Sequence, residues 1–171
     1  MSAIGRAYLA LLNGLALLAG LIVLAIFALM VVDVAMRDLG YHPPGFTVAF
    51  VEYGLLFFTM FAAPYLVRQK AHIIVDAFTT QLPWSVIRVT EKVVYAICVV
   101  SMLVCLAVAT ELLLESIASG NIDMRGVMDT PEWVMYAPLP LCFALLAIEF
   151  GRFLLGYDSL YARRDVTSER F

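Results

Sequence analysis

The chain has 171 residues, of which 63% are hydrophobic and only 15% charged, and its mean hydropathy is +0.93. An average soluble domain is roughly 45–50% apolar, so a soluble protein of this length has too little interior to bury this much apolar surface. We therefore expect lipid to be its solvent, and the net charge of -3 argues against nucleic acid as a partner.

Four apolar runs are long enough to cross a bilayer as helices, which takes roughly 20 residues each. None of the runs alternates polar with apolar residues, as a strand of a membrane barrel would. The sequence therefore predicts an all-α integral membrane protein, with residues 1–171 forming a single membrane domain. Its four predicted transmembrane helices span about 8–32, 48–67, 93–114 and 133–155.

The first run follows Arg6 and is about 25 residues long, well beyond the ~7–15 apolar residues of a signal peptide. It ends in the charged stretch DVAMRD rather than in a small-residue cleavage site. We therefore expect an uncleaved first span. Asp33 and Arg37 lie one helical turn apart at its end, where they can pair with each other.

The second run carries Glu52 about one turn from its start. An ionisable group near the hydrocarbon is costly, so it is usually paired or functional, unless its side chain reaches the interface by snorkelling. The short connection between the first two runs places Arg37 at a similar depth. We therefore predict a partly buried ion pair between Arg37 and Glu52.

The second run is followed by the polar stretch RQKAHIIVDAFTTQLP, residues 68–83. Its His72 and Asp76 have the i, i+4 spacing of two metal ligands on a helix, but two ligands without a third are a weak signal. We expect a hydrogen-bonded or solvated pair and no metal. The sequence has no CxxC motif, positioned nucleophile or glycine-rich phosphate loop, so we expect neither a cofactor nor enzymatic activity.

Two interpretations stay open for residues 83–92. Pro83 suits the first turn of a helix, and Trp84 suits the headgroup layer, which together favour a short helix lying in the membrane interface. Alternatively, the segment forms only the wet first turns of the third span.

The fourth run begins at Trp133 and contains the sequence PLP, with Pro138 and Pro140, where we expect a kink. At its far end Glu149 and Arg152 are spaced i, i+3 and can pair. Elsewhere the middle of the spans is Leu, Val, Ala, Met and Phe, without the polar groups expected of a protein that carries substrate alone. A subunit packed against a larger partner fits this pattern better.

Basic residues predict the orientation, because cytoplasmic loops carry an excess of Lys and Arg. With four spans, nine of the eleven basic residues lie on the side of the two termini and of residues 68–83, and only Arg37 and Arg125 on the other. We therefore expect both termini and His72 in the cytoplasm.

The order of several motifs resembles the small membrane subunit, the DctQ-like Q component, of tripartite ATP-independent periplasmic (TRAP) transporters. The resemblance runs from the first span to the fourth. It rests on four matching motifs. These are Arg37 before Gly40, Glu52 in FVEYGLLFF, the cytoplasmic AHIIVDAFTTQLP with His72, Asp76, Leu82 and Pro83, and PEWVMYAPLP with Pro131 and Trp133.

The resemblance implies a non-catalytic scaffold subunit in a bacterial inner membrane. It implies as partners a large membrane subunit, the M component, which carries substrate and sodium, and a periplasmic substrate-binding protein that delivers an organic acid. Membrane lipids surround the complex. On this interpretation the structural or subunit-interface candidates are Arg37, Glu52, His72, Asp76, Trp84 and Trp133.

Two alternatives remain. A small four-span multidrug-type exporter usually has a glutamate deep in its first span, whereas the first span here has no acid before Asp33. The other alternative is an assembly subunit of an unrelated membrane complex.

Overall fold

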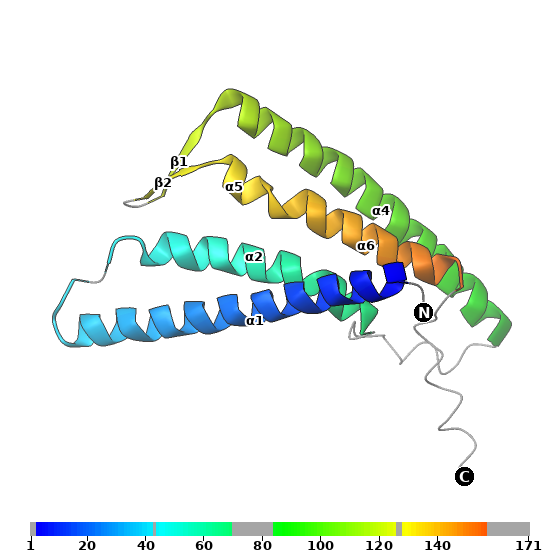
Figure 1. Ribbon diagram of the computed structural model, residues 1–171, viewed down its shortest axis with the longest axis horizontal. Coiled ribbons are helices and arrows are strands. Elements are labelled where there is room, and N and C mark those ends of the chain that lie inside the picture. The colour runs from blue at the N-terminus through cyan, green and yellow to red at the C-terminus, as the bar shows by residue number, and fades with distance from the viewer. Residues whose placement is uncertain (1–2, 43, 70–83, 126–127, 157–171) are drawn as a thin grey trace, which may run out of the picture.

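A computed structural model describes residues 3–42, 44–69, 84–125 and 128–156 (Figure 1). Within these ranges, four helical segments are long and apolar enough to cross a membrane: Gly5–Asp38, Thr47–Arg68, Lys92–Ser119 and Trp133–Leu154. The predicted all-α fold with four spans is therefore confirmed. The elements in chain order are α1 (Ala3–Asp38), α2 (Thr47–Arg68), α4 (Trp84–Ser119), β1 (Ile122–Arg125), β2 (Met128–Pro131), α5 (Trp133–Tyr136) and α6 (Pro138–Leu154).

The helices form two antiparallel pairs. Helix α1 packs against α2, and α4 packs against α6, while α2 and α6 join the two pairs. Figure 1 shows the resulting order α1, α2, α6, α4, with the two pairs closest where α2 and α6 end and diverging towards the strands. We call the end with the start of α1 and the last turns of α2 and α6 the terminal end, and the opposite end the hairpin end.

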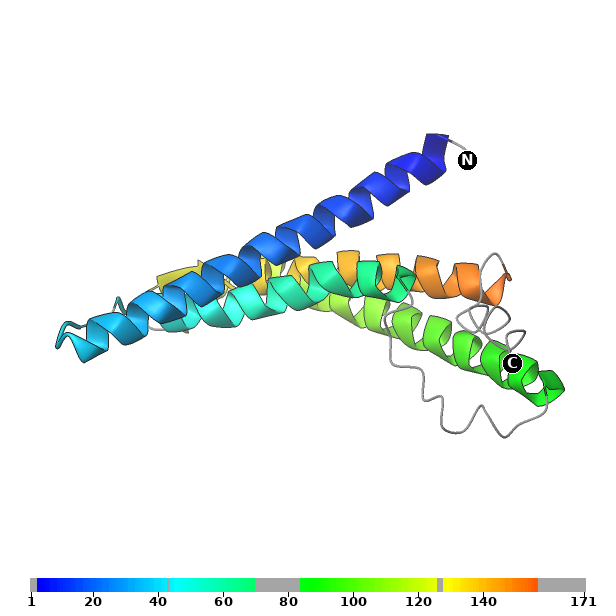
Figure 2. The same ribbon diagram turned by 90° about the horizontal axis from the view of Figure 1, so that it is seen from below.

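A cluster of buried residues lies towards the terminal end. Val67 of α2, Tyr95 of α4 and Phe153 of α6 are buried there with Cys142 and Leu146. The rings of Tyr95 and Phe153 stack with their centroids 5.6 Å apart. Among the described side chains, those of this cluster come from α2, α4 and α6, and Figure 2 shows α1 inclined to the other helices.

Helices α1 and α4 are each 36 residues long. At 1.5 Å per residue each spans about 54 Å, well beyond a hydrocarbon core about 30 Å thick. Both helices therefore continue past the boundaries that hydropathy alone predicted. Residues 84–92 are the first turns of the single helix α4, which agrees with the second interpretation of this segment and not with a separate interfacial helix.

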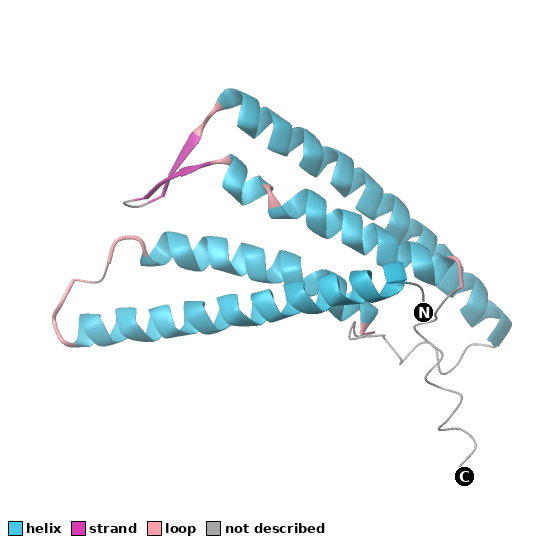
Figure 3. Ribbon diagram, in the orientation of Figure 1, coloured by secondary structure: helices cyan, strands magenta, loops and turns pink. Residues whose placement is uncertain are grey.

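The fourth span is interrupted as the PLP sequence predicted. Helix α5 ends at Tyr136, and α6 begins at Pro138, after Ala137. Proline is tolerated at the start of a helix because its missing N–H would have no partner there. Figure 3 shows this short break in the helical ribbon.

The hairpin end contains two strands that the sequence analysis did not predict. Strands β1 and β2 pair antiparallel, with Ile122 opposite Pro131 and Asp123 opposite Thr130. On the other pair of helices, α1 ends at Asp38 and is followed by Gly40, whose φ of 78° lies in the left-handed region that favours glycine. The Tyr41 N–H donates to the Met36 carbonyl across this glycine, which closes the helix.

Candidate functional site

A buried carboxylate lies at the centre of a charged cluster at the terminal end. The side chain of Glu149 in α6 is 0% exposed. Its Oε1 accepts a hydrogen bond of 2.9 Å from Arg68 of α2, and its Oε2 accepts one of 2.8 Å from Arg152 of α6. The predicted i, i+3 pairing of Glu149 with Arg152 is therefore confirmed, and Arg68 is a second partner.

Helix α1 reaches the same cluster through Tyr8. The Arg68 guanidinium lies over the Tyr8 ring, 5.5 Å from its centroid, a geometry in which the cation is attracted to the ring face. The Tyr8 hydroxyl is buried next to the Glu149 carboxylate. We call Tyr8, Arg68, Glu149 and Arg152 the terminal cluster, since it links α1, α2 and α6.

Each oxygen of the buried Glu149 carboxylate has a cationic partner. Transfer of an isolated carboxylate into an apolar interior is prohibitive, whereas charge-assisted bonds to both oxygens make burial of Glu149 tolerable. Arg68 is the last residue of α2, and Arg152 lies in the last turn of α6. Both cations are therefore also placed where the helix dipole favours positive charge.

The hairpin end is joined through a tyrosine hydroxyl instead. The Tyr53 hydroxyl of α2 donates to Asp123 Oδ2 at 3.0 Å and lies 2.7 Å from Thr130 Oγ1. These contacts connect α2 with both strands. They cross the region where the two helix pairs diverge.

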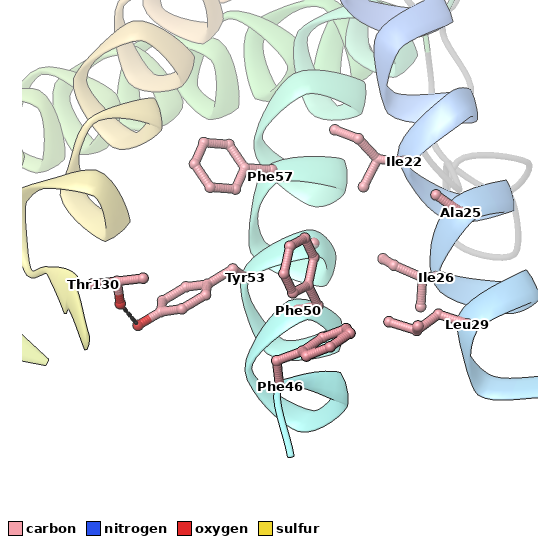
Figure 4. Close-up of a pocket in the computed structure, with 10 residues that line it drawn as sticks. Ile22, Ala25, Ile26, Leu29, Phe46, Phe50, Tyr53, Phe57 and Thr130 are labelled. Carbon is pink, nitrogen blue, oxygen red and sulfur yellow. Dashed lines mark hydrogen bonds between the residues drawn. The ribbon is translucent and has the colours of Figure 1, made fainter. Parts of the chain in front are cut away.

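An apolar cavity of about 510 Å³ lies beside these contacts (Figure 4). Its lining has two hydroxyl groups, from Tyr53 and Thr130, and these lie within hydrogen-bond distance of each other. The other lining residues are apolar: Ile22, Ala25, Ile26 and Leu29 from α1, and Phe46, Phe50, Gly54 and Phe57 at the start of α2 and within it. A cavity with this lining can hold an apolar group, but it has no cation for an anionic ligand.

Arg37 lies at the hairpin end of α1 and pairs there with Asp33. Arg37 Nε lies 3.0 Å from Asp33 Oδ2, one turn earlier in α1, and the Arg37 side chain is 63% exposed. The pairing of Asp33 with Arg37 that their spacing allowed is therefore present. Glu52 is exposed on α2, and its pairing with Arg37 stays a prediction.

The remaining candidates are distributed over the chain. His72 and Asp76 lie outside the described residues. Trp84 is the first residue of α4 and Trp133 the first residue of α5, with the Trp133 residue 44% exposed. The structure therefore does not bring the six candidates together into one site within the part of the chain that it describes.

Small residues in the first two helices have unequal surroundings. A Cβ added at Gly54 would lie 2.6 Å from Ile26 Cδ1 of α1, so this glycine permits α2 to approach α1 closely. By contrast, nothing lies within 4 Å of a Cβ at Gly14 or Gly20. Only Gly54 of these three is therefore used for packing inside the chain.

Several residues of these sites were not singled out from the sequence: Tyr8 and Arg68 in the terminal cluster, and Tyr53, Asp123 and Thr130 at the hairpin end. Arg68 was interpreted only as the residue that ends the second span. A signal for its second role was present, because Glu149 lies at the end of an apolar run close to the predicted depth of Arg68. The tyrosines carried no comparable signal, since Tyr is common near membrane interfaces.

Comparison with known proteins connects these features with one family. The model of the DctQ component of tripartite ATP-independent periplasmic transporters matches residues 26–156, which is more than half of the chain. No curated protein and no solved structure matches the chain significantly. The matched range includes α2, the strands and α6, and with four membrane-spanning helices it agrees with the motif order found in the sequence. The chain therefore belongs to the family of DctQ components, the small membrane subunits of TRAP transporters.

Proposed function

We propose that this chain is the non-catalytic scaffold subunit of a sodium-coupled TRAP transporter for organic acids. It braces the large membrane subunit, which receives substrate from a periplasmic binding protein. Family membership supports the association with such a transporter. The bracing role, the sodium coupling and the class of substrate are the proposed parts.

The observation that carries this proposal is the chemistry of the apolar cavity. An organic acid crosses a membrane as an anion, so its site needs cations, helix N-termini or other donors at mid-membrane. The cavity offers only two hydroxyl groups, already within bonding distance of each other, among apolar side chains. The cations of the terminal cluster lie at the ends of α2 and α6 and share one buried carboxylate. The transport step therefore belongs to a partner.

Exposed apolar surface supports a role in packing against that partner. Leu17, Leu24 and Phe27 of α1 are each about two-thirds exposed. In lipid, such surface gains little from hydrophobic burial alone, so a stable complex relies on close packing and on a few polar contacts. The exposed glycines Gly14 and Gly20 allow close approach of another helix. We further propose Arg37, Glu52, His72, Asp76, Trp84 and Trp133 as residues for structural or subunit contacts.

The proposed orientation places both termini and His72 in the cytoplasm of a bacterial cell, with the chain in the inner membrane. The start of α1 and the end of α6 lie at the same end of the bundle, as an even number of spans requires (Figure 1). Single cysteines introduced in a background without Cys98, Cys105 and Cys142 test the orientation. We expect an impermeant thiol reagent added outside cells to label residue 121 but not residue 72, and the opposite pattern contradicts it.

Reconstitution into liposomes tests the function. We expect the purified chain alone to show no uptake of an organic acid under a sodium gradient. Together with its large subunit and binding protein it should be required for full uptake. Sodium-driven uptake by the chain alone contradicts the scaffold role, and proton-driven export of a lipophilic cation would instead indicate an exporter.

A further inference from the structure

We propose that the terminal cluster binds the phosphate of an anionic phospholipid, held by Arg68 and Arg152 on the side facing away from Glu149. The inference concerns a lipid site on this chain and goes beyond its role in transport. In the proposed orientation the bound lipid belongs to the cytoplasmic leaflet.

The terminal cluster has more hydrogen-bond donors than acceptors. Each guanidinium has five N–H donors. In the described structure Arg68 and Arg152 each use one nitrogen, NH1, to donate to Glu149. One carboxylate therefore faces many more donors than it can satisfy, and a phosphate supplies additional oxygen acceptors.

The terminal cluster also has more positive than negative groups. Two guanidinium groups and one carboxylate leave the cluster with a net charge of +1, because arginine stays protonated in proteins. An excess charge beside hydrocarbon is unfavourable, and one phosphodiester neutralises it. Basic pockets between transmembrane helices are a recognised chemistry for anionic headgroups. A headgroup that also has an ammonium group would bring another positive charge close to the two arginines. The site therefore favours a lipid with net negative charge.

The two arginines reach the surface of the bundle, whereas Glu149 does not. Glu149 is 0% exposed, whereas the side chains of Arg68 and Arg152 are 22% and 34% exposed. The carboxylate thus lies inside the bundle, and the unused parts of both guanidinium groups reach its surface. They do so at the ends of two membrane-spanning helices, where headgroups lie. The planar donors of arginine suit bidentate contact with phosphate.

Lipid binding by the purified full-length chain tests the proposal. Native mass spectrometry in detergent would count the retained molecules of phosphatidylglycerol and of phosphatidylcholine, and thermal unfolding would follow each addition. We expect phosphatidylglycerol to remain bound and to raise the melting temperature, and phosphatidylcholine to do so much less. Equal effects of the two lipids overturn the proposal.

The decisive variant is Arg152→Gln, because it removes the excess charge but leaves Glu149 paired with Arg68. We expect its affinity for phosphatidylglycerol to fall about tenfold, as expected for loss of one charge-assisted contact. Arg37→Gln is the matched control, since it removes the same charge from an arginine that pairs with Asp33 at the opposite end. An equal loss in both variants would reduce the effect to net charge and overturn the assignment.

A lysine variant and inorganic phosphate separate the effect of charge from that of the lipid. Arg152→Lys keeps the charge but loses the planar donors, so a smaller loss of about threefold is expected, and this variant carries the test if Arg152→Gln does not fold. Inorganic phosphate at millimolar concentration should neither raise the melting temperature nor displace the lipid. Displacement would assign the site to a soluble anion and overturn the lipid assignment.

Discussion

The two ends of the bundle are held together by different chemistry. At the terminal end, a fully buried Glu149 pairs with two arginines, and an aromatic and aliphatic core packs beside it. At the hairpin end, α2 reaches the strands through the Tyr53 hydroxyl, next to an apolar cavity of about 510 Å³. The terminal end therefore combines a buried charge with a buried core. The hairpin end combines the hydroxyl contacts of Tyr53 with an apolar cavity.

The difference explains the shape of the molecule. Burial of an ion pair tolerates little separation of its partners, because any gap leaves a charge in a low-dielectric environment. The contact of a hydroxyl group costs less to break than a buried ion pair, because a neutral group costs less to expose. The helix pairs accordingly meet at the terminal end and diverge at the hairpin end, as Figure 1 shows. The following substitutions separate the contributions of the two ends.

The largest effect is expected from removal of the buried carboxylate. Glu149→Leu leaves Arg68 and Arg152 facing the interior without a counter-ion, and loss of one partner of a buried pair costs about 3–5 kcal/mol. Unfolding of the purified protein in mixed micelles, followed by circular dichroism, measures the loss. A loss below about 1 kcal/mol would show that the terminal cluster is solvated and would remove the contrast between the two ends.

A triple variant separates pairing from packing. Combining Glu149→Leu with Arg68→Met and Arg152→Met replaces all charges with apolar groups of similar size, a change that is often neutral for a buried ionic triad. We expect it to recover most of the stability that the single change loses. Failure to recover would mean that the arginines act through other contacts, such as that of Arg68 with the Tyr8 ring.

This cluster shows how far the sequence could be interpreted. The pairing of Glu149 with Arg152 followed from helical spacing, since i and i+3 lie on one face whatever the tertiary arrangement. The contact of Arg68 with Glu149 joins residues 81 positions apart, and it depends on which helices are neighbours. Hydropathy places Arg68 and Glu149 at a similar depth but does not give the packing order of the helices, so the sequence alone did not identify Arg68 as the partner of Glu149.

The next effect concerns the close approach of α1 and α2. In Gly54→Ala the new Cβ would lie 2.6 Å from Ile26 Cδ1, and relief of such overlap by small shifts costs about 1–3 kcal/mol. Gly14→Ala is the control, because its Cβ would meet nothing within 4 Å. The same unfolding assay should show a loss only for Gly54→Ala, and Ile26→Val should restore part of it by removing the nearest atom. Equal results for both glycines would contradict the packing of α1 on α2.

A smaller effect is expected at the polar contact of the hairpin end. Tyr53→Phe removes the hydroxyl that bonds Asp123 and contacts Thr130, and loss of such a hydrogen bond costs about 1 kcal/mol. Tyr41→Phe is the matched control, because Tyr41 is 66% exposed in the connection between α1 and α2. Hydrogen exchange of the strand amides should accelerate in Tyr53→Phe and not in the control. Unchanged exchange would show that the strands are held by other contacts.

The hairpin end was harder to predict than the helices. The break at Ala137 followed from Pro138, whose effect on backbone geometry is local. The strands β1 and β2 are only four residues each, too short for an alternating pattern to stand out. Their contact with Tyr53 again joins distant parts of the chain, 70 and 77 residues apart. Local backbone rules were therefore predictive, and long-range contacts were not.

The smallest effect is expected for Arg37, for which the sequence offers two partners, Asp33 and Glu52. The structure pairs it with Asp33 at 3.0 Å, with the Arg37 side chain 63% exposed and that of Asp33 12% exposed, and helical pairs of this spacing contribute about 0.3–0.5 kcal/mol. The sequence-based pair with Glu52, if buried, would contribute several times more. Two double-mutant cycles, Arg37→Ala with Asp33→Ala and Arg37→Ala with Glu52→Ala, compare the partners directly. We expect a weak coupling to Asp33, and the second cycle tests the pair of Arg37 with Glu52 that the sequence predicts. A coupling to Glu52 above about 1 kcal/mol, together with partial recovery in the exchange Arg37→Glu with Glu52→Arg, would show that the hairpin end also contains a buried ion pair and would narrow the contrast between the two ends.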